Sequence, residues 1–128
     1  MATEVTQGKQ YIPGLLAASS MASNRGKVVK FASTAGQFTL VNATTDLAIG
    51  VLEDTPAAGQ PGLICAAGIS VVVAGVNDLA AGEVFGYNTT AQIADHTTDN
   101  RRIIGRALEA STAVGDLVKA LIFPAARY

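Results

Sequence analysis

Tryptophan is absent from this sequence of 128 residues, cysteine and histidine occur once each, and aromatic residues make up only 5%. One cysteine cannot close a disulfide within the chain, and Cys65 lies in the apolar stretch "GLICAAG", which predicts a small buried side chain. With few aromatics, a core must be built from Val, Ile, Leu and Ala. Because 49% of the residues are hydrophobic, we expect burial between subunits as well as within one.

Long hydrophobic runs are also missing. No apolar stretch approaches the roughly 18 residues that a membrane-spanning helix needs. The N-terminus lacks a basic segment followed by an apolar one, so we expect neither a secretory signal nor a membrane partner.

Lysine and arginine are absent from positions 31–100, which contain seven acidic residues. The flanking segments, 1–30 and 101–128, each carry a net charge of about +3. No basic cluster with interleaved aromatics is present, so nucleic acid is not an expected partner. The layout favours contact between basic ends and acidic middles of neighbouring copies, or with an acidic surface.

Groups that could carry out catalysis do not converge. The single histidine, His96, lies in the polar stretch "ADHTTDNRR", and one histidine cannot build a histidine-rich metal site. Asp95, Asp99 and Asn100 offer oxygen ligands, but without EF-hand spacing. Glu53 and Asp54 are adjacent on an expected strand and would point to opposite faces. We therefore expect no enzyme activity, no catalytic residue, no metal and no cofactor.

Glycine marks the starts of the expected strands. It precedes a charged residue and an apolar run in "GKVVKF" (26–31), "GEVFGY" (82–87) and "GDLVKALIF" (115–123). Further strands are expected at 37–41, 47–53, 62–68, 69–75 and 102–109. Short strands at such regular spacing predict an all-β sandwich or small barrel.

Two stretches resemble each other. Ile49 to Cys65 reads "IGVLEDTPAAGQPGLIC", and Ile104 to Phe123 reads "IGRALEASTAVGDLVKALIF". Each pattern predicts a strand, a connection and a second strand, that is, a β-hairpin with a rather long loop.

The last expected strand is apolar on both faces. Val118, Ala120 and Ile122 would face one side. The opposite side would carry the candidate subunit-interface residues, which are Leu117, Lys119, Leu121 and Phe123. An exposed strand of a monomer would alternate cleanly, so this second face is expected to meet another part of the barrel or another subunit.

The first 24 residues are rich in Ser, Ala and Gln and lack sheet alternation. We predict an extended N-terminal arm over 1–24, ordered only where something holds it, and a β-domain over 25–128. Such arms can add a strand to an exposed sheet edge. The candidate capsid-contact residues of the arm are Thr3, Glu4, Val5, Thr6, Gln10, Tyr11 and Ile12.

The recurring Gly-charged-Val phrases, the order of "GEVFGYNTTAQIADHTTDNRRIIGRALEA", and the closing "GDLVKALI" resemble the capsid cement or decoration proteins of tailed phages. The resemblance covers residues 25–123. It implies a compact β-tulip or β-barrel domain, commonly a homotrimer. Pro56, Pro61 and a one-residue deletion distinguish the first hairpin from the second.

The resemblance also implies a function. Such a protein is made in the host cytoplasm and sits on the outer capsid surface of the virion at threefold or quasi-threefold sites. There it stabilises the shell by binding the major capsid protein. The alternative is a non-enzymatic β-domain on the virion surface that binds host glycans or another virion protein. Tyr11, Tyr87 and Tyr128 are few aromatics for glycan binding.

Overall fold

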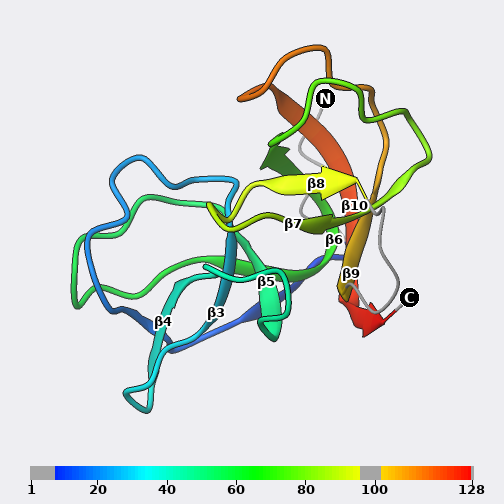
Figure 1. Cartoon of the computed structure of the whole chain (residues 1–128). Helices are drawn as coiled ribbons and strands as arrows, with labels where there is room; N and C mark the ends of the chain where they lie inside the picture. Colours follow the sequence, from blue (N-terminus) through cyan, green and yellow to red (C-terminus); the bar gives the residue numbers. More distant parts are fainter. Residues whose placement is uncertain (1–7, 96–101, 128) are drawn as a thin grey trace, which may run out of the picture.

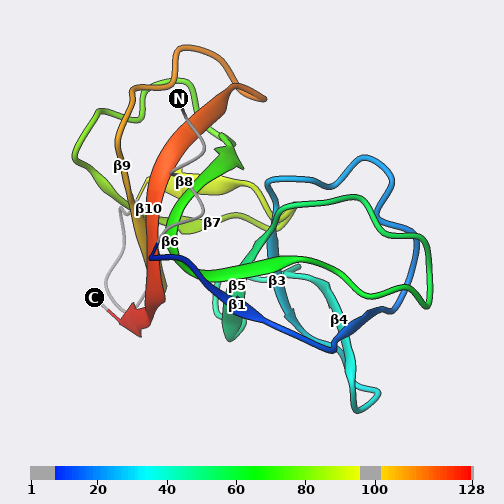
Figure 2. The same cartoon turned by 180° about the vertical axis from the view of Figure 1, so that it is seen from behind.

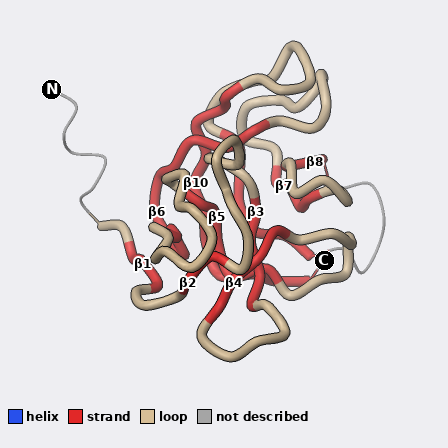
Figure 3. The backbone as a smooth tube through the Cα atoms, turned by 90° about the vertical axis from the view of Figure 1, so that its left-hand side faces the viewer, coloured by secondary structure: helices blue, strands red, loops and turns tan. Residues whose placement is uncertain are grey.

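The computed structural model describes residues 8–95 and 102–127, with side chains up to Phe123. Figure 3 shows only strands and loops in this part of the chain. No membrane-spanning helix is therefore found among the described residues. The ten strands are β1 (Gln10–Ile12), β2 (Leu16–Ala17), β3 (Val28–Phe31), β4 (Gln37–Leu40), β5 (Ala48–Leu52), β6 (Ile64–Val73), β7 (Val84–Tyr87), β8 (Ile93–Asp95), β9 (Arg102–Ala107) and β10 (Leu117–Arg127).

All ten strands belong to one sheet (Figure 1), which confirms the all-β prediction. The strand order is β2-β4-β3-β5-β6-β10-β9-β7-β8, and β1 pairs separately with β6. The sheet does not close into the barrel that the sequence predicts. Its two ends, β2 and β8, belong to different halves of the molecule, and the β6–β10 pair lies between them in the strand order.

The two halves repeat the same strand arrangement. The order β4-β3-β5-β6 in the first half matches β8-β7-β9-β10 in the second. Equivalent hydrogen bonds support the match: the Gly26 amide donates to the Leu52 carbonyl over 2.7 Å, and the Gly82 amide donates to the Ala107 carbonyl over 2.7 Å. The hairpins expected from the repeated sequence are the antiparallel pairs β5–β6 and β9–β10.

In each half, the segment that comes first in sequence contacts both ends of that half's strand order. In the first half, β1 pairs antiparallel with β6, while β2 pairs parallel with β4. In the second half, the later part of β6 pairs antiparallel with β10, and Ala74 forms a parallel bridge to Ile93 of β8. Strand β6 therefore belongs to both halves, and it passes from one to the other in Figure 2. Gly68 supplies the positive φ of 117° at this junction.

The glycine of the repeated Ile-Gly pair is required for the same steric reason in both halves. A Cβ on Gly105 would lie 2.6 Å from the Leu121 carbonyl oxygen and 2.6 Å from the Phe85 ring. A Cβ on Gly50 would meet the Cys65 carbonyl oxygen in the equivalent place. Because only glycine permits such close approach of strand backbones, each of the two hairpins requires glycine at this position.

Aliphatic side chains dominate the interior. One hydrophobic cluster draws residues from both halves, including Val28, Val51, Phe85 and Ile104. A second cluster lies within the first half around Phe38 and Met21. Cys65 is fully buried, as predicted, and burial raises the pKa of its thiol to about 11. The glycines expected to open strands, Gly26, Gly82 and Gly115, have φ values of 85°, 89° and 94° and stand just before β3, β7 and β10.

The N-terminal segment differs from the expected arm over the residues that the structure describes. β1 and β2 pair with strands of the same chain, and Ala17 and Met21 are 1% exposed in the core. These strands are three and two residues long, too short for alternation to appear in the sequence. Residues 8–24 are held by the chain's own sheet, whereas Thr3, Glu4, Val5 and Thr6 lie outside the described residues.

Candidate functional site

The outer face of the central β6–β10 pair is apolar and exposed. Leu117 lies opposite Val73, Lys119 opposite Val71, and Leu121 opposite Ile69. The exposed fractions are 39% for Ile69, 43% for Val71, 67% for Leu117 and 40% for Leu121. Val118, Ala120 and Ile122 are buried on the other side, which confirms the expected alternation of β10. We call Ile69, Val71, Leu117, Lys119 and Leu121 the β6–β10 face.

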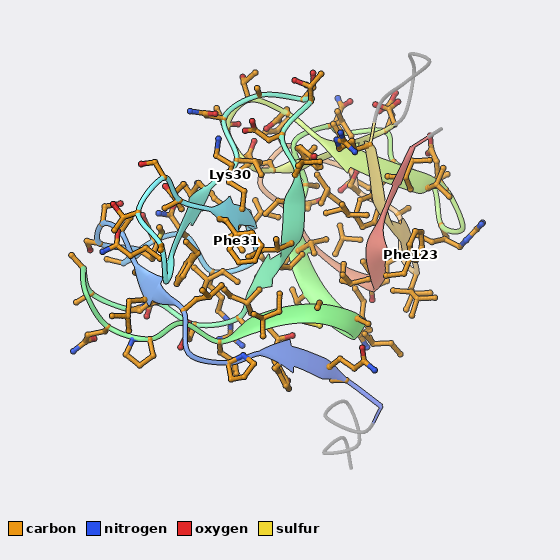
Figure 4. All side chains as sticks on the ribbon, turned by 90° about the horizontal axis from the view of Figure 1, so that it is seen from below. Lys30, Phe31 and Phe123 are labelled. Atoms are coloured by element: carbon orange, nitrogen blue, oxygen red, sulfur yellow. The ribbon has the colours of Figure 1, made fainter. Side chains whose placement is uncertain are left out.

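Polar groups border this face. Lys119 is exposed, and its backbone amide donates to Glu109 Oε1 over 3.0 Å. Arg106 lies opposite Leu121 on β9 and donates to the Gly82 carbonyl over 2.7 Å. Leu108 extends the apolar surface with 43% of its area exposed. Phe123, the fourth interface candidate, is half-buried near the middle of β10 and is labelled in Figure 4.

A groove runs beside β6 along the same face. It consists of two hollows, of about 140 and 470 Å³, that share Arg25 and Val71. The smaller hollow is lined by Lys9, Glu53, Ile69, Ser70 and Lys119 in addition. The larger hollow continues past Gly26 and Thr55 to Leu117. Basic and apolar side chains therefore share one concave surface.

A buried ion pair lines the smaller hollow. Lys9 Nζ lies 2.8 Å from Glu53 Oε2, and the two side chains are 7% and 12% exposed. The Ser70 hydroxyl donates to Glu53 Oε2 over 2.6 Å, and the Tyr11 hydroxyl donates to Oε1 over 3.1 Å. Burial opposes the charge of Glu53, but the bonds from Lys9, Ser70 and Tyr11 outweigh it and lower the pKa of this carboxyl.

Three candidate capsid-contact residues of the arm, Gln10, Tyr11 and Ile12, form β1 and pair with the first part of β6. Gln10 pairs with Ala67, Tyr11 with Cys65 and Ile12 with Ile64. The Tyr11 hydroxyl is committed to Glu53, and the Tyr87 hydroxyl donates to the Asp46 carbonyl. Phe31, labelled in Figure 4 beside Lys30, is an aromatic side chain with 59% of its surface exposed.

Groups suited to metal binding do not gather in residues 8–95 and 102–123. Glu53 belongs to the buried ion pair, while the Asp54 carboxylate accepts a bond from the Leu63 amide over 3.0 Å, so the two carboxylates have different partners. Both residues follow the end of β5 at Leu52. His96, Asp99 and Asn100 lie outside the described residues.

The sequence pattern does not single out two residues of the β6–β10 face, Ile69 and Val71, or the groove residue Arg25. Ile69 and Val71 belong to an apolar run that predicts a strand, but its partner depends on the register with β10, which local pattern does not reveal. Arg25 lies in a turn far from β10 in sequence. The uneven charge of the chain was the signal that could have singled it out.

Comparison with known proteins gives a structural match. No protein-family model matches the chain, and no curated protein matches its sequence. Among solved structures, the N base of head fiber gp8.5 of bacteriophage phi29 superposes with a TM-score of 0.66 at 14% identity. The match covers 94% of this chain and 98% of that chain. The chain thus shares its fold with the base of a phage head fiber.

Proposed function

We propose that the chain is a structural protein of a phage virion that decorates the outer surface of the head and stabilises the shell. The observation that carries this proposal is the match over nearly the whole length of both chains to a head-fiber base. Shared fold alone does not carry function. The cement-protein resemblance of the sequence motifs in residues 25–123 points independently to the same location.

The proposal extends to assembly and partner. The chain forms a homotrimer at threefold or quasi-threefold sites and binds the major capsid protein. Leu117, Lys119, Leu121 and Phe123 are the proposed subunit-interface residues, because three of them are exposed on an apolar sheet face. The N-terminal segment before β1, which includes Thr3 to Thr6, is the proposed shell contact. No catalysis, metal or cofactor is part of this role.

Attachment to heads tests the function. Purified phage heads that lack the protein are mixed with it, sedimented and imaged by electron cryomicroscopy. We expect saturable binding and added density at threefold positions, because repeated weak contacts within a trimer act together. Raising the salt concentration should weaken attachment if ion pairs contribute. Heads without added protein are the control, and heads that stay bare at saturating protein contradict the proposal.

Glycan binding is the second candidate function, and the exposed Phe31 ring is the observation that favours it. Sugar rings commonly stack on exposed aromatic side chains. A glycan array would show binding that Phe31→Ala abolishes. An array without hits removes this candidate.

A further inference from the structure

The charges without a partner are distributed unevenly in the described part of the chain. Three basic side chains, Arg25, Lys27 and Lys119, make neither an ion pair nor a hydrogen bond through their charged groups. Among carboxylates of the same residues, Asp78 alone accepts nothing. Asp54, Glu83 and Glu109, by contrast, each accept a backbone amide.

Two of the free cations line the groove. Lys9, the third cation there, is neutralised by Glu53, so Arg25 and Lys119 leave the groove with an excess of positive charge. Ile69, Val71 and Leu117 supply the apolar part of its wall. A complementary occupant therefore combines a carboxylate with an exposed aliphatic side chain.

A free carboxylate and an exposed aliphatic side chain lie on two loops at one end of the molecule. The β6–β7 loop carries Asp78, and the β9–β10 loop carries Val114, which is 63% exposed. Both loops lie together at the same end of the molecule in Figures 1 and 2. We call these two loops the tip.

The tip is held by a hydrogen-bond network centred on Ser111, which is 4% exposed. The Leu79 amide donates to Ser111 Oγ over 3.1 Å, and Ser111 Oγ donates to the Val76 carbonyl over 2.9 Å. The Ser111 amide donates to the Leu79 carbonyl over 2.9 Å, and the Gly115 amide donates to the Ala74 carbonyl over 2.7 Å. The tip can therefore present Asp78 and Val114 with little loss of conformational entropy.

We propose that the tip of one copy docks in the groove of a second copy, with the Asp78 carboxylate between Arg25 and Lys119 and Val114 against Val71 and Leu117. This inference rests on the self-association put forward above and names the contacts that produce it. Planar guanidinium groups bind carboxylates through paired hydrogen bonds, so Arg25 supplies orientation as well as charge.

The contact is head-to-tail. Tip and groove are different surfaces, so each copy uses both and can hold two neighbours. Such a contact closes into a ring when the rotation that relates successive copies returns to the starting copy. A rotation of a third of a turn gives the proposed trimer. The β6–β10 face would then be covered by the neighbour.

Sedimentation velocity of the full chain without heads tests the contact. Arg25→Glu and Asp78→Lys should each raise the dissociation constant of the assembly by at least about tenfold, because each places like charges together. Lys27→Glu is the matched control, since Lys27 is equally unpartnered but does not line the groove, and it should stay within about twofold. The double variant Arg25→Glu/Asp78→Lys restores opposite charges and should recover most of the loss.

Circular dichroism confirms that each variant folds, and Asp78→Asn replaces Asp78→Lys if the latter does not. The inference is overturned if the wild-type chain is monomeric, if the single variants assemble like wild type, or if the double variant shows no recovery. The outcome is separate from the head-binding test. A monomer that decorates heads overturns this contact and the proposed homotrimer but leaves the proposed decoration of heads standing, whereas an assembly that ignores heads overturns the decoration role and leaves this contact standing.

Discussion

Glu53 shows how one carboxylate joins three parts of the chain. It follows β5, and its oxygens accept bonds from Lys9 and Tyr11 at the N-terminal strand and from Ser70 on β6. Burial lowers the pKa of Lys9, but the hydrogen bond and charge of Glu53 more than reverse this and raise it. Both shifts favour the ionised pair, so the interaction is strongest where both groups are charged.

Glu53→Gln should destabilise the fold by on the order of 3 kcal/mol at neutral pH, because it leaves Lys9 buried without a counter-charge. The pH dependence has a definite sign. The pKa of Glu53 is lowered from 4.5 in the folded state, so its contribution is present above about 4.5 and is lost as the pH falls through the folded value. Urea unfolding at a series of pH values should show wild type losing more stability on acidification than Glu53→Gln.

Two other carboxylates also have lowered pKa values, and the comparison of wild type with Glu53→Gln cancels their contribution to the pH dependence. The pKa values of Asp46 and Asp116 are also lowered, but both residues are present in both proteins. Glu109→Gln, at an exposed position, should change stability by less than about 0.5 kcal/mol. Parallel pH curves for wild type and Glu53→Gln would show that the ion pair does not set the acid response.

At the scale of elements, the N-terminal segment is part of the domain. β1 adds to β6, and the Met21 amide donates to the Pro56 carbonyl over 2.8 Å while its side chain fills the second cluster. This arrangement is strand addition within one chain, where the sequence predicts addition to a partner's sheet. The proposed shell contact therefore rests on fewer residues than the 24-residue arm that the sequence predicts.

Two truncations separate these roles. Removing residues 1–7 should leave the melting temperature unchanged while weakening attachment to heads. Removing residues 1–24 should abolish cooperative folding, because loss of Met21 alone costs about 2–5 kcal/mol and typical domains have only about 5–15 kcal/mol in total. Thermal unfolding followed by circular dichroism measures both. A chain of residues 25–128 that melts like the full protein would contradict this account.

The sequence predicts the strands better than it predicts their partners. Gly26, Gly82 and Gly115 mark strand starts correctly, and the two faces of β10 follow from alternation. The register that sets Lys119 opposite Val71 depends on contacts between distant segments, so local pattern cannot supply it. For the same reason, the cationic groove around Arg25 emerges only in the folded chain.

For the whole molecule, the sequence reveals part of the internal repeat. The Ile-Gly hairpins are visible because Gly50 and Gly105 both meet a partner carbonyl. The outer surfaces have diverged, so the match of complete halves appears only in their strand order and hydrogen bonds. The predicted barrel fails at this scale, because β6 passes between two curled halves and does not complete one ring.

The shared strand predicts one unfolding transition. β6 contributes pairs to both halves, and the larger cluster includes side chains from both. Phe38→Ala in the first half and Phe85→Ala in the second should each cost about 3–5 kcal/mol and lower the same single calorimetric peak. A residual peak at the wild-type temperature in either variant would show that the halves unfold separately.

The repeated halves have a consequence for symmetry. Each chain contributes two lobes with a common backbone plan, but one lobe carries Lys119 and Leu117 on its outer face while the other is clamped by the Lys9–Glu53 pair. A closed set of three chains would then show six similar protrusions in outline and only three identical chemical neighbourhoods. Such a trimer would match the outline of a hexagonal arrangement of shell subunits while binding only alternate subunits.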